Sequence, residues 1–209
     1  MARTGRPRAF DRDEAIIKAM HLFWQHGFEG VSLDQLRREM GGISSASFYA
    51  AFKSKEELYR ETLEQYLGTY GRVMTPLRDC RLAPRDRIEQ ALRKSAAMQT
   101  ATAHPAGCMI ALASTICSEQ GASVQAVTAA ERTANRAGIR ACITAAVDDG
   151  TLRANTDIDG LTALFDGVLL GLSIQARDGT SVTAIDAGIG HAMQAWDAMR
   201  SPAAGRGED

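Results

Sequence analysis

The sequence of 209 residues has little that would mark a secreted, membrane or metal-binding protein. Its 4 cysteines show no Cys-x-x-Cys spacing, which indicates neither a disulfide framework nor a zinc ribbon. No apolar run reaches the roughly 18–20 residues that span a bilayer, and the basic N-terminus lacks the apolar core of a signal peptide. We therefore expect a soluble, cytoplasmic protein with reduced thiols and without a metal, a cofactor or a membrane partner.

Catalytic motifs are also missing. There is no Gly-x-Ser-x-Gly, no phosphate loop and no His-Glu-x-x-His, and the 4 histidines are isolated from one another. His104 and Cys108 lie four residues apart, but a Pro and a Gly between them favour a helix-breaking loop over a metal site. We expect a protein that is not an enzyme; a helical enzyme remains the alternative, which an assay for small-molecule turnover would reveal.

Residues 32–55 predict two short helices, a tight turn and the start of a third helix. Ser32 and Gln35 form a capping box that opens the first helix, and Gly41–Gly42 ends it. Ser44 can cap the second helix. Residues 1–60 carry 10 Lys and Arg against 8 Asp and Glu, whereas the remainder carries 14 against 17, so only the N-terminal part is basic on balance.

The second of these helices has a face suited to DNA. Phe48 and Phe52 turn inward at helical spacing and leave an outer face that is small, polar and nearly uncharged. Short hydroxyl and methyl groups allow close approach to base edges, while a Tyr hydroxyl and nearby Lys hold phosphates. Ordinary helix packing would explain the same pattern. In this segment we predict DNA contacts by Ser32, Ser44, Ser45, Ala46, Ser47, Tyr49, Lys53 and Lys55.

One run of residues crosses the turn, the second helix and the start of the third: Ile43, Ser44, Phe48, Tyr49, Phe52, Ser54, Lys55, Glu56 and Leu58. This run resembles the DNA-binding signature of the TetR (tetracycline-repressor-like) family of bacterial transcription regulators. Gly41–Gly42 makes the turn one residue longer than the family's commonest Ala-Gly-Val form.

A short basic arm precedes the first helix. Gly and Pro within residues 2–8 prevent a helix there, and an arm of this kind can place Arg side chains in the minor groove. We predict DNA contacts by Arg6 and Arg8; a frayed, solvated tail is the alternative.

The rest of the chain predicts an all-α protein. The family resemblance implies an N-terminal three-helix helix-turn-helix domain over residues 1–65, joined by a long helix to a helical ligand-sensing and dimerisation domain over residues 66–200. We expect a disordered tail over 201–209. Capping and apolar periodicity predict helices at 11–26, from 54 toward Pro76, from Pro84 to His104, over a fully buried stretch at 107–117, and at 123–149, 157–177 and 182–199.

Apolar stripes on the last two helices predict a dimer interface. Glycines at 167, 171, 188 and 190 weaken helices, so close helix approach is a reason for them, and the family's dimers are four-helix bundles. Intramolecular core is the alternative. The predicted interface residues are Leu161, Phe165, Val168, Gly171, Leu172, Ile185, Ile189, Met193 and Trp196.

The resemblance implies a homodimeric repressor that binds a near-palindromic double-stranded operator at the nucleoid and is released by a small-molecule inducer. The alternative is a regulator that responds to thiol modification at Cys108, which follows Gly107 where a helix is expected to start. Cys108 could also be a small hydrophobic side chain that is buried in the core. The residues predicted to line the inducer pocket, between helices at about 85–180, are Met98, Cys108, Met109, Leu112, Ile116 and Phe165.

Overall fold

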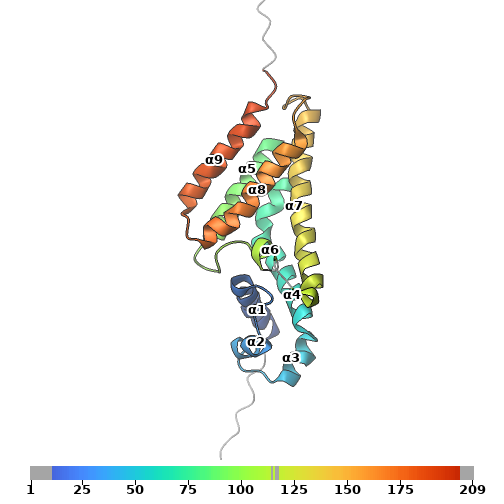
Figure 1. Cartoon of the computed structure of the whole chain (residues 1–209), viewed down its shortest axis with the longest axis vertical. Coiled ribbons are helices and arrows are strands. Elements are labelled where there is room, and N and C mark those ends of the chain that lie inside the picture. The colour runs from blue at the N-terminus through green and yellow to red at the C-terminus, as the bar shows by residue number, and fades with distance from the viewer. Residues whose placement is uncertain (1–10, 114, 116–117, 203–209) are drawn as a thin grey trace, which may run out of the picture.

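The computed structural model describes residues 11–113, 115 and 118–202, and throughout this part of the chain the regular elements are helical, so the all-α prediction is confirmed. Figure 1 shows α1, α2 and α3 at one end of an elongated molecule and α5, α7, α8 and α9 at the other. The helices are α1 Arg12–His26, α2 Leu33–Glu39, α3 Ser45–Phe52, α4 Lys55–Gly68, α5 Pro84–Gln99, α6 Met109–Leu112, α7 Ala122–Asp148, α8 Ile158–Arg177 and α9 Val182–Ala198, with 3-10 turns η1 Tyr70–Arg78 and η2 Glu119–Gly121.

The predicted N-terminal caps are formed in the first four helices. Each capping side chain accepts a hydrogen bond from a backbone amide that has no partner inside the helix. The pairs are Asp11 Oδ1 with Glu14 N (3.0 Å), Ser32 Oγ with Gln35 N (3.1 Å), Ser44 Oγ with Ser47 N (3.0 Å) and Ser54 Oγ with Glu57 N (3.1 Å).

Two apolar clusters hold the chain together. The first is built on α1 to α4 and includes Phe23 and Trp24, but it also takes in Met109 and Ile110 of α6. The second joins α5, α7, α8 and α9 around Phe165. By length and composition α8 could cross a bilayer, yet its buried face packs into this second cluster, as in a core helix. The short helix α6 therefore belongs to the core of the N-terminal end, although α5 precedes it.

Three helices are shorter than the sequence predicts. α4 ends at Gly68 because Thr69 leaves the helical region (φ −122°, ψ −88°), and the chain continues toward Pro76 as the 3-10 turn η1. α5 ends at Gln99 instead of His104. Within the described part of the predicted buried helix 107–117, only the four residues of α6 are helical.

The short α6 ends where it meets the N-terminal helices. The carbonyl of Ala113 accepts a hydrogen bond from the amide of Phe28 at 2.7 Å. Gly27 precedes that amide with φ +75°, and a Cβ at this position would lie 3.2 Å from the Ala113 oxygen. Glycine thus permits both the backbone conformation and the close approach of the two segments.

Trp24 ties α1 to the C-terminal helices. Its side chain is fully buried, and Nε1 donates to the Gly107 carbonyl at 3.1 Å. Its own carbonyl accepts from the Arg177 guanidinium at the end of α8, at 2.7 Å. The indole stacks on the ring of His104, with centroids 4.6 Å apart and planes at 19°. One residue of α1 therefore contacts both the loop before α6 and the end of α8.

This junction predicts a pH dependence of stability. Burial lowers the pKa of His21, one turn before Trp24, below its ordinary 6.5, and nearby His104 lowers this pKa further. The unfolded chain therefore binds this proton more readily, so stability falls as the pH drops through about 6.5 toward the folded-state pKa. We expect His21→Gln to reduce the fall in melting temperature between about pH 7.5 and 5.5. Exposed His191 on α9 supplies the control variant His191→Gln, and equal slopes for both variants would contradict the prediction.

Candidate functional site

The outer face of α3 has the composition that the sequence predicts. Phe48 and Phe52 are buried, whereas Ser45, Ala46 and Ser47 are exposed. Tyr49 is 49% exposed, and its ring meets Phe48 edge to face with centroids 5.5 Å apart. A convex surface of small residues with one exposed phenol can approach base edges closely.

The turn before α3 depends on two adjacent glycines and one arginine. Gly41 and Gly42 have φ of +89° and +77°, and a Cβ on either would meet nothing within 4 Å. Glycine is thus needed at these two positions for the positive φ and not for lack of space. Arg37 Nε donates to the Ile43 carbonyl at 3.0 Å, while its Nη1 pairs with Asp34 at 3.0 Å. Arg37 is not among the predicted site residues, because its spacing from Asp34 is that of an ordinary surface ion pair.

Lys53 joins α3 to α4 in a strained turn. It is exposed and has φ +63° and ψ −53°, and the amide of Ser54 donates to the carbonyl of Phe52 at 2.7 Å. These features define a γ-turn with positive φ, which is rare and costs energy for a residue with a side chain. The direction of α3 relative to α4 is therefore fixed by this turn.

Lys55 and Arg12 both contact aromatic rings beside α3. Lys55 Nζ lies 4.4 Å from the centroid of Phe28. Arg12 Cζ lies 5.1 Å from the centroid of Phe52, and its guanidinium pairs with Glu61 at 2.6 Å. These contacts hold two cations near the start of α4 and α1, where phosphate groups could reach them. Contacts of Lys55 with phosphate stay a prediction, and Arg6 and Arg8 lie outside the described residues.

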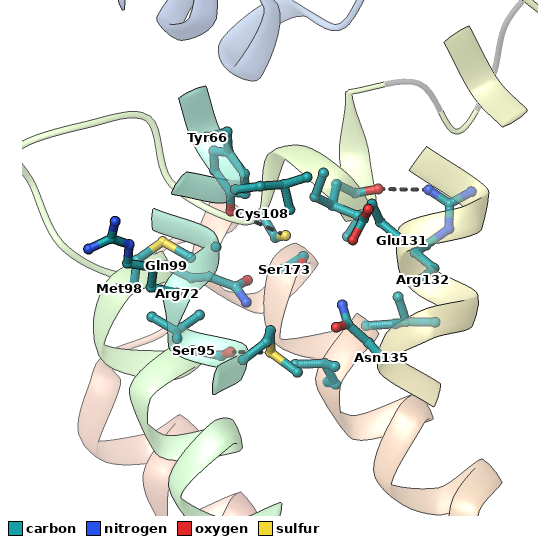
Figure 2. Close-up of a pocket in the computed structure, with 18 of the residues that line it drawn as sticks. Tyr66, Arg72, Ser95, Met98, Gln99, Cys108, Glu131, Arg132, Asn135 and Ser173 are labelled. Atoms are coloured by element: carbon teal, nitrogen blue, oxygen red, sulfur yellow. Dashed lines mark hydrogen bonds between the residues drawn. The ribbon is translucent and has the colours of Figure 1, made fainter. Parts of the chain in front are cut away.

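A cavity of about 210 Å³ lies among α4, η1, α5, α6, α7 and α8, away from the exposed face of α3. Figure 2 shows its walls, to which each of these elements contributes side chains. The lining combines apolar and polar groups: Tyr66, Leu67, Gly71, Arg72, Val73, Met74, Thr75, Arg78, Ser95, Met98, Gln99, Cys108, Ile110, Ala111, Glu131, Arg132, Asn135, Leu169, Leu170 and Ser173.

The predicted pocket residues are only partly placed there. Met98 and Cys108 line the cavity, and Ile116 lies outside the described residues. Met109 is fully buried in the N-terminal cluster and Phe165 in the C-terminal cluster. Leu112 lines a separate hollow beside Gly27. Ligand contacts of Met109, Leu112 and Phe165 stay a prediction, although an apolar stripe marks the core more often than a ligand site.

The polar side chains that line the cavity were not predicted as pocket residues. Ser95, Gln99 and Ser173 are buried among apolar neighbours on α5 and α8, where apolar periodicity gives them no distinguishing signal. Tyr66 Oη donates to Cys108 Sγ at 3.4 Å. Burial first, and then the neighbouring Cys108, raise the pKa of Tyr66 well above 10, so its phenol stays protonated and remains a donor.

The predicted interface stripes lie mostly inside the single chain. Leu161, Phe165, Leu172, Ile185, Ile189, Met193 and Trp196 are all core residues of the C-terminal cluster, so the single chain already buries them, whereas Val168 and Gly171 are half-buried. The reason is that α8 packs against α5 and α7, and α9 packs against α5 and α8. The next face around the two helices forms a groove of about 430 Å³, lined by Ala163, Leu164, Gly167, Val168, Gly171, Leu172, Gln175, Ile185, Gly188 and Ile189.

Comparison with known proteins decides the family. Residues 16–62 match the family model described as bacterial regulatory proteins of the tetR family, and residues 84–204 match the tetracyclin repressor-like C-terminal domain. The chain belongs to the TetR family. It is a DNA-binding transcription regulator.

Relatives of this TetR-family chain agree with that assignment. The transcriptional repressor ComR of Escherichia coli K12 is 29% identical over 196 residues, 92% of this chain and 91% of ComR. The repressor BdcR of the same organism is 37% identical over 107 residues, 51% of this chain and 53% of BdcR. A cysteine mutant of the regulator CifR, solved with 26-base-pair operator DNA, is 38% identical with a TM-score of 0.83, covering 91% of this chain and 100% of that chain.

Proposed function

We propose that this TetR-family regulator is a homodimeric repressor, which leaves its operator when a small molecule enters the cavity between α4 and α8. The observation that carries the proposal is the double role of α6. Ile110 lines the cavity and also belongs to the apolar cluster of the N-terminal helices. Ala113, directly after α6, holds the amide of Phe28. A ligand that alters the position of α6 therefore acts on the DNA-binding end without touching DNA.

The release follows from differential affinity. A ligand shifts an equilibrium only if it binds one arrangement more tightly than another. Tyr66 adds a second link, because it lines the cavity on α4 and belongs to the N-terminal cluster. The proposed inducer favours positions of α6 and α4 in which the two α3 helices of the dimer no longer match successive major grooves. Binding alone, without turnover, completes this cycle in the cytoplasm.

The DNA contacts that we propose follow the α3 face. Ser45, Ala46 and Ser47 approach base edges, and Tyr49 with the lysines holds phosphates. The operator complexes of CifR support this assignment, since CifR resembles the chain over nearly its whole length. Arg6 and Arg8 of the basic arm contact the minor groove, and the further DNA contacts are Ser32, Ser44, Lys53 and Lys55. The operator is a near-palindrome whose half-sites lie about 34–36 Å apart, or a multiple of this.

The first test of function separates the base-reading residue from the phosphate contact. Lys55→Ala is expected to weaken operator and random DNA alike and to lower the salt dependence of binding by about one unit of slope. Ser45→Ala is expected to change the preference at one base pair by about 1–3 kcal/mol while leaving random DNA unaffected. Titrations of labelled operator and random duplexes at several salt concentrations measure both. Equal loss on both duplexes for both variants would refute the proposed roles.

The proposed dimer face is the groove between α8 and α9. A Cβ on Gly167 or Gly188 meets nothing within 4 Å, so packing inside one chain does not require these glycines. Leu164 beside them is 40% exposed. An open apolar groove floored by glycines lets a second copy approach closely. Of the predicted interface residues that line this groove, Val168 and Gly171 are half-buried, whereas Leu172, Ile185 and Ile189 are buried core residues.

Arginine in the groove tests the dimer face. Gly167→Arg and Gly188→Arg are expected to fold normally, because the new Cβ has room, and to sediment as monomers with weak operator binding. Gly68→Arg at the end of α4 is the matched control, since a Cβ there also meets nothing within 4 Å. A stable dimer for both groove variants would move the interface elsewhere.

The second candidate function is that of a regulator that responds to thiol modification at Cys108. Its sulfur lines the cavity and accepts a hydrogen bond from the Tyr66 hydroxyl. A group added to the sulfur would therefore occupy part of the cavity and break this hydrogen bond. The inducer is preferred because the cavity is formed without any change at Cys108. We expect a thiol alkylating agent to leave operator binding of the wild type intact. Release of the wild type but not of Cys108→Ser would make Cys108 the sensor.

A further inference from the structure

Two buried polar atoms of the cavity wall have no hydrogen-bond partner among the described residues. They are Gln99 Oε1 on α5 and Ser173 Oγ on α8. Their residues are only 2% and 0% exposed, and both line the cavity. Figure 2 shows them together near the middle of the pocket. A buried polar group without a partner destabilises a fold, so we expect this pair to have a binding partner.

The buried polar groups of the wall are uncharged. Ser95, the third of them, already donates to Met74 Sδ at 3.4 Å. The charged residues of the lining are less buried: Arg72 and Arg78 are exposed, and Glu131 and Arg132 are half-buried. Arg132 donates to the Ile110 carbonyl at 2.7 Å. Gln99 and Ser173 carry no charge, so an ionised group bonded to them would lose its hydration without gaining an opposite charge from either partner. The group that meets this pair is therefore neutral.

The size of the cavity and the direction of its free hydrogen bonds limit the chemical class of the ligand further. A cavity of roughly 150 Å³ holds benzene in another protein, so the 210 Å³ here takes one ring with a few further atoms. Leu67, Ile110 and Leu169 offer apolar walls for its body. Gln99 Oε1 only accepts, whereas Ser173 Oγ both donates and accepts. A hydroxyl group matches both, since it donates one hydrogen bond and accepts another.

We propose that the effector is a small neutral hydroxyl compound of about one ring, whose hydroxyl binds Gln99 and Ser173 while its apolar body fills the cavity. This inference rests on the proposed function, because it names the class of inducer for the same cavity. Phenol, toluene and benzoate are matched probes: they share a ring and differ in having a neutral hydroxyl, no polar group or a negative charge.

The experiment measures probe affinity by calorimetry on the DNA-free protein. Phenol is expected to bind the wild type about tenfold more tightly than toluene, and benzoate is expected to bind most weakly. Gln99→Leu and Ser173→Ala each remove one orphan group, so they are expected to weaken phenol about tenfold without weakening toluene. Unchanged thermal melting, or a higher melting temperature, shows that each variant folds. If a variant melts earlier, the wild-type order of the three probes still decides the proposal.

Two outcomes overturn the proposal. Equal affinities of phenol and toluene would show that Gln99 and Ser173 do not contribute to ligand binding. Tightest binding of benzoate would show that the site prefers an anion. Operator release is measured separately. Phenol binding that depends on Gln99 and Ser173 without releasing operator would refute the proposed function alone. Operator release by compounds whose affinity is the same for the wild type and for both variants would refute only the proposal that the effector carries a hydroxyl group.

Discussion

The hydrogen bond between the amide of Phe28 and the carbonyl of Ala113 fixes how the two ends of the molecule meet. It ends α6, requires glycine at position 27 and brings α6 into the core of the N-terminal helices. Glu29 strengthens the same junction by accepting from the amide and hydroxyl of Ser118, at 3.0 and 2.8 Å. These bonds lower the pKa of Glu29, so the carboxylate stays charged and keeps accepting them.

Such a junction suits coupling between distant sites because it is built from backbone groups and buried rings, which have few alternative arrangements. Trp24 cannot shift without disturbing its bonds to Gly107 and Arg177. Movement at the cavity therefore passes to α1 as displacement of a packed unit. The physical requirement on a ligand is modest: it needs a preference for one packing over another, which Tyr66 and Ile110 on the cavity wall can sense directly.

The parts of the structure that sequence reasoning predicted are those governed by local rules. Capping serines, helix-ending glycines and the inward phenylalanines of α3 act over three or four residues, and the structure places them as expected. Long-range features were not predictable in this way. The short α6 depends on a contact with Phe28, far away in sequence, and the cavity depends on Gln99 and Ser173 from different helices. Apolar stripes showed that Phe165 and Trp196 are buried, but not whether a partner copy or their own chain buries them.

The strained turn at Lys53 has a consequence for the kinetics of operator recognition. Because Ser54 caps α4 and Phe52 is buried beside the turn, its neighbours hold Lys53 in an unfavourable conformation before any DNA is present. The face of α3 that we propose for base contacts is thus preorganised: its orientation costs little additional conformational entropy at the moment of binding. Contact of this face with DNA would then require no refolding of the turn.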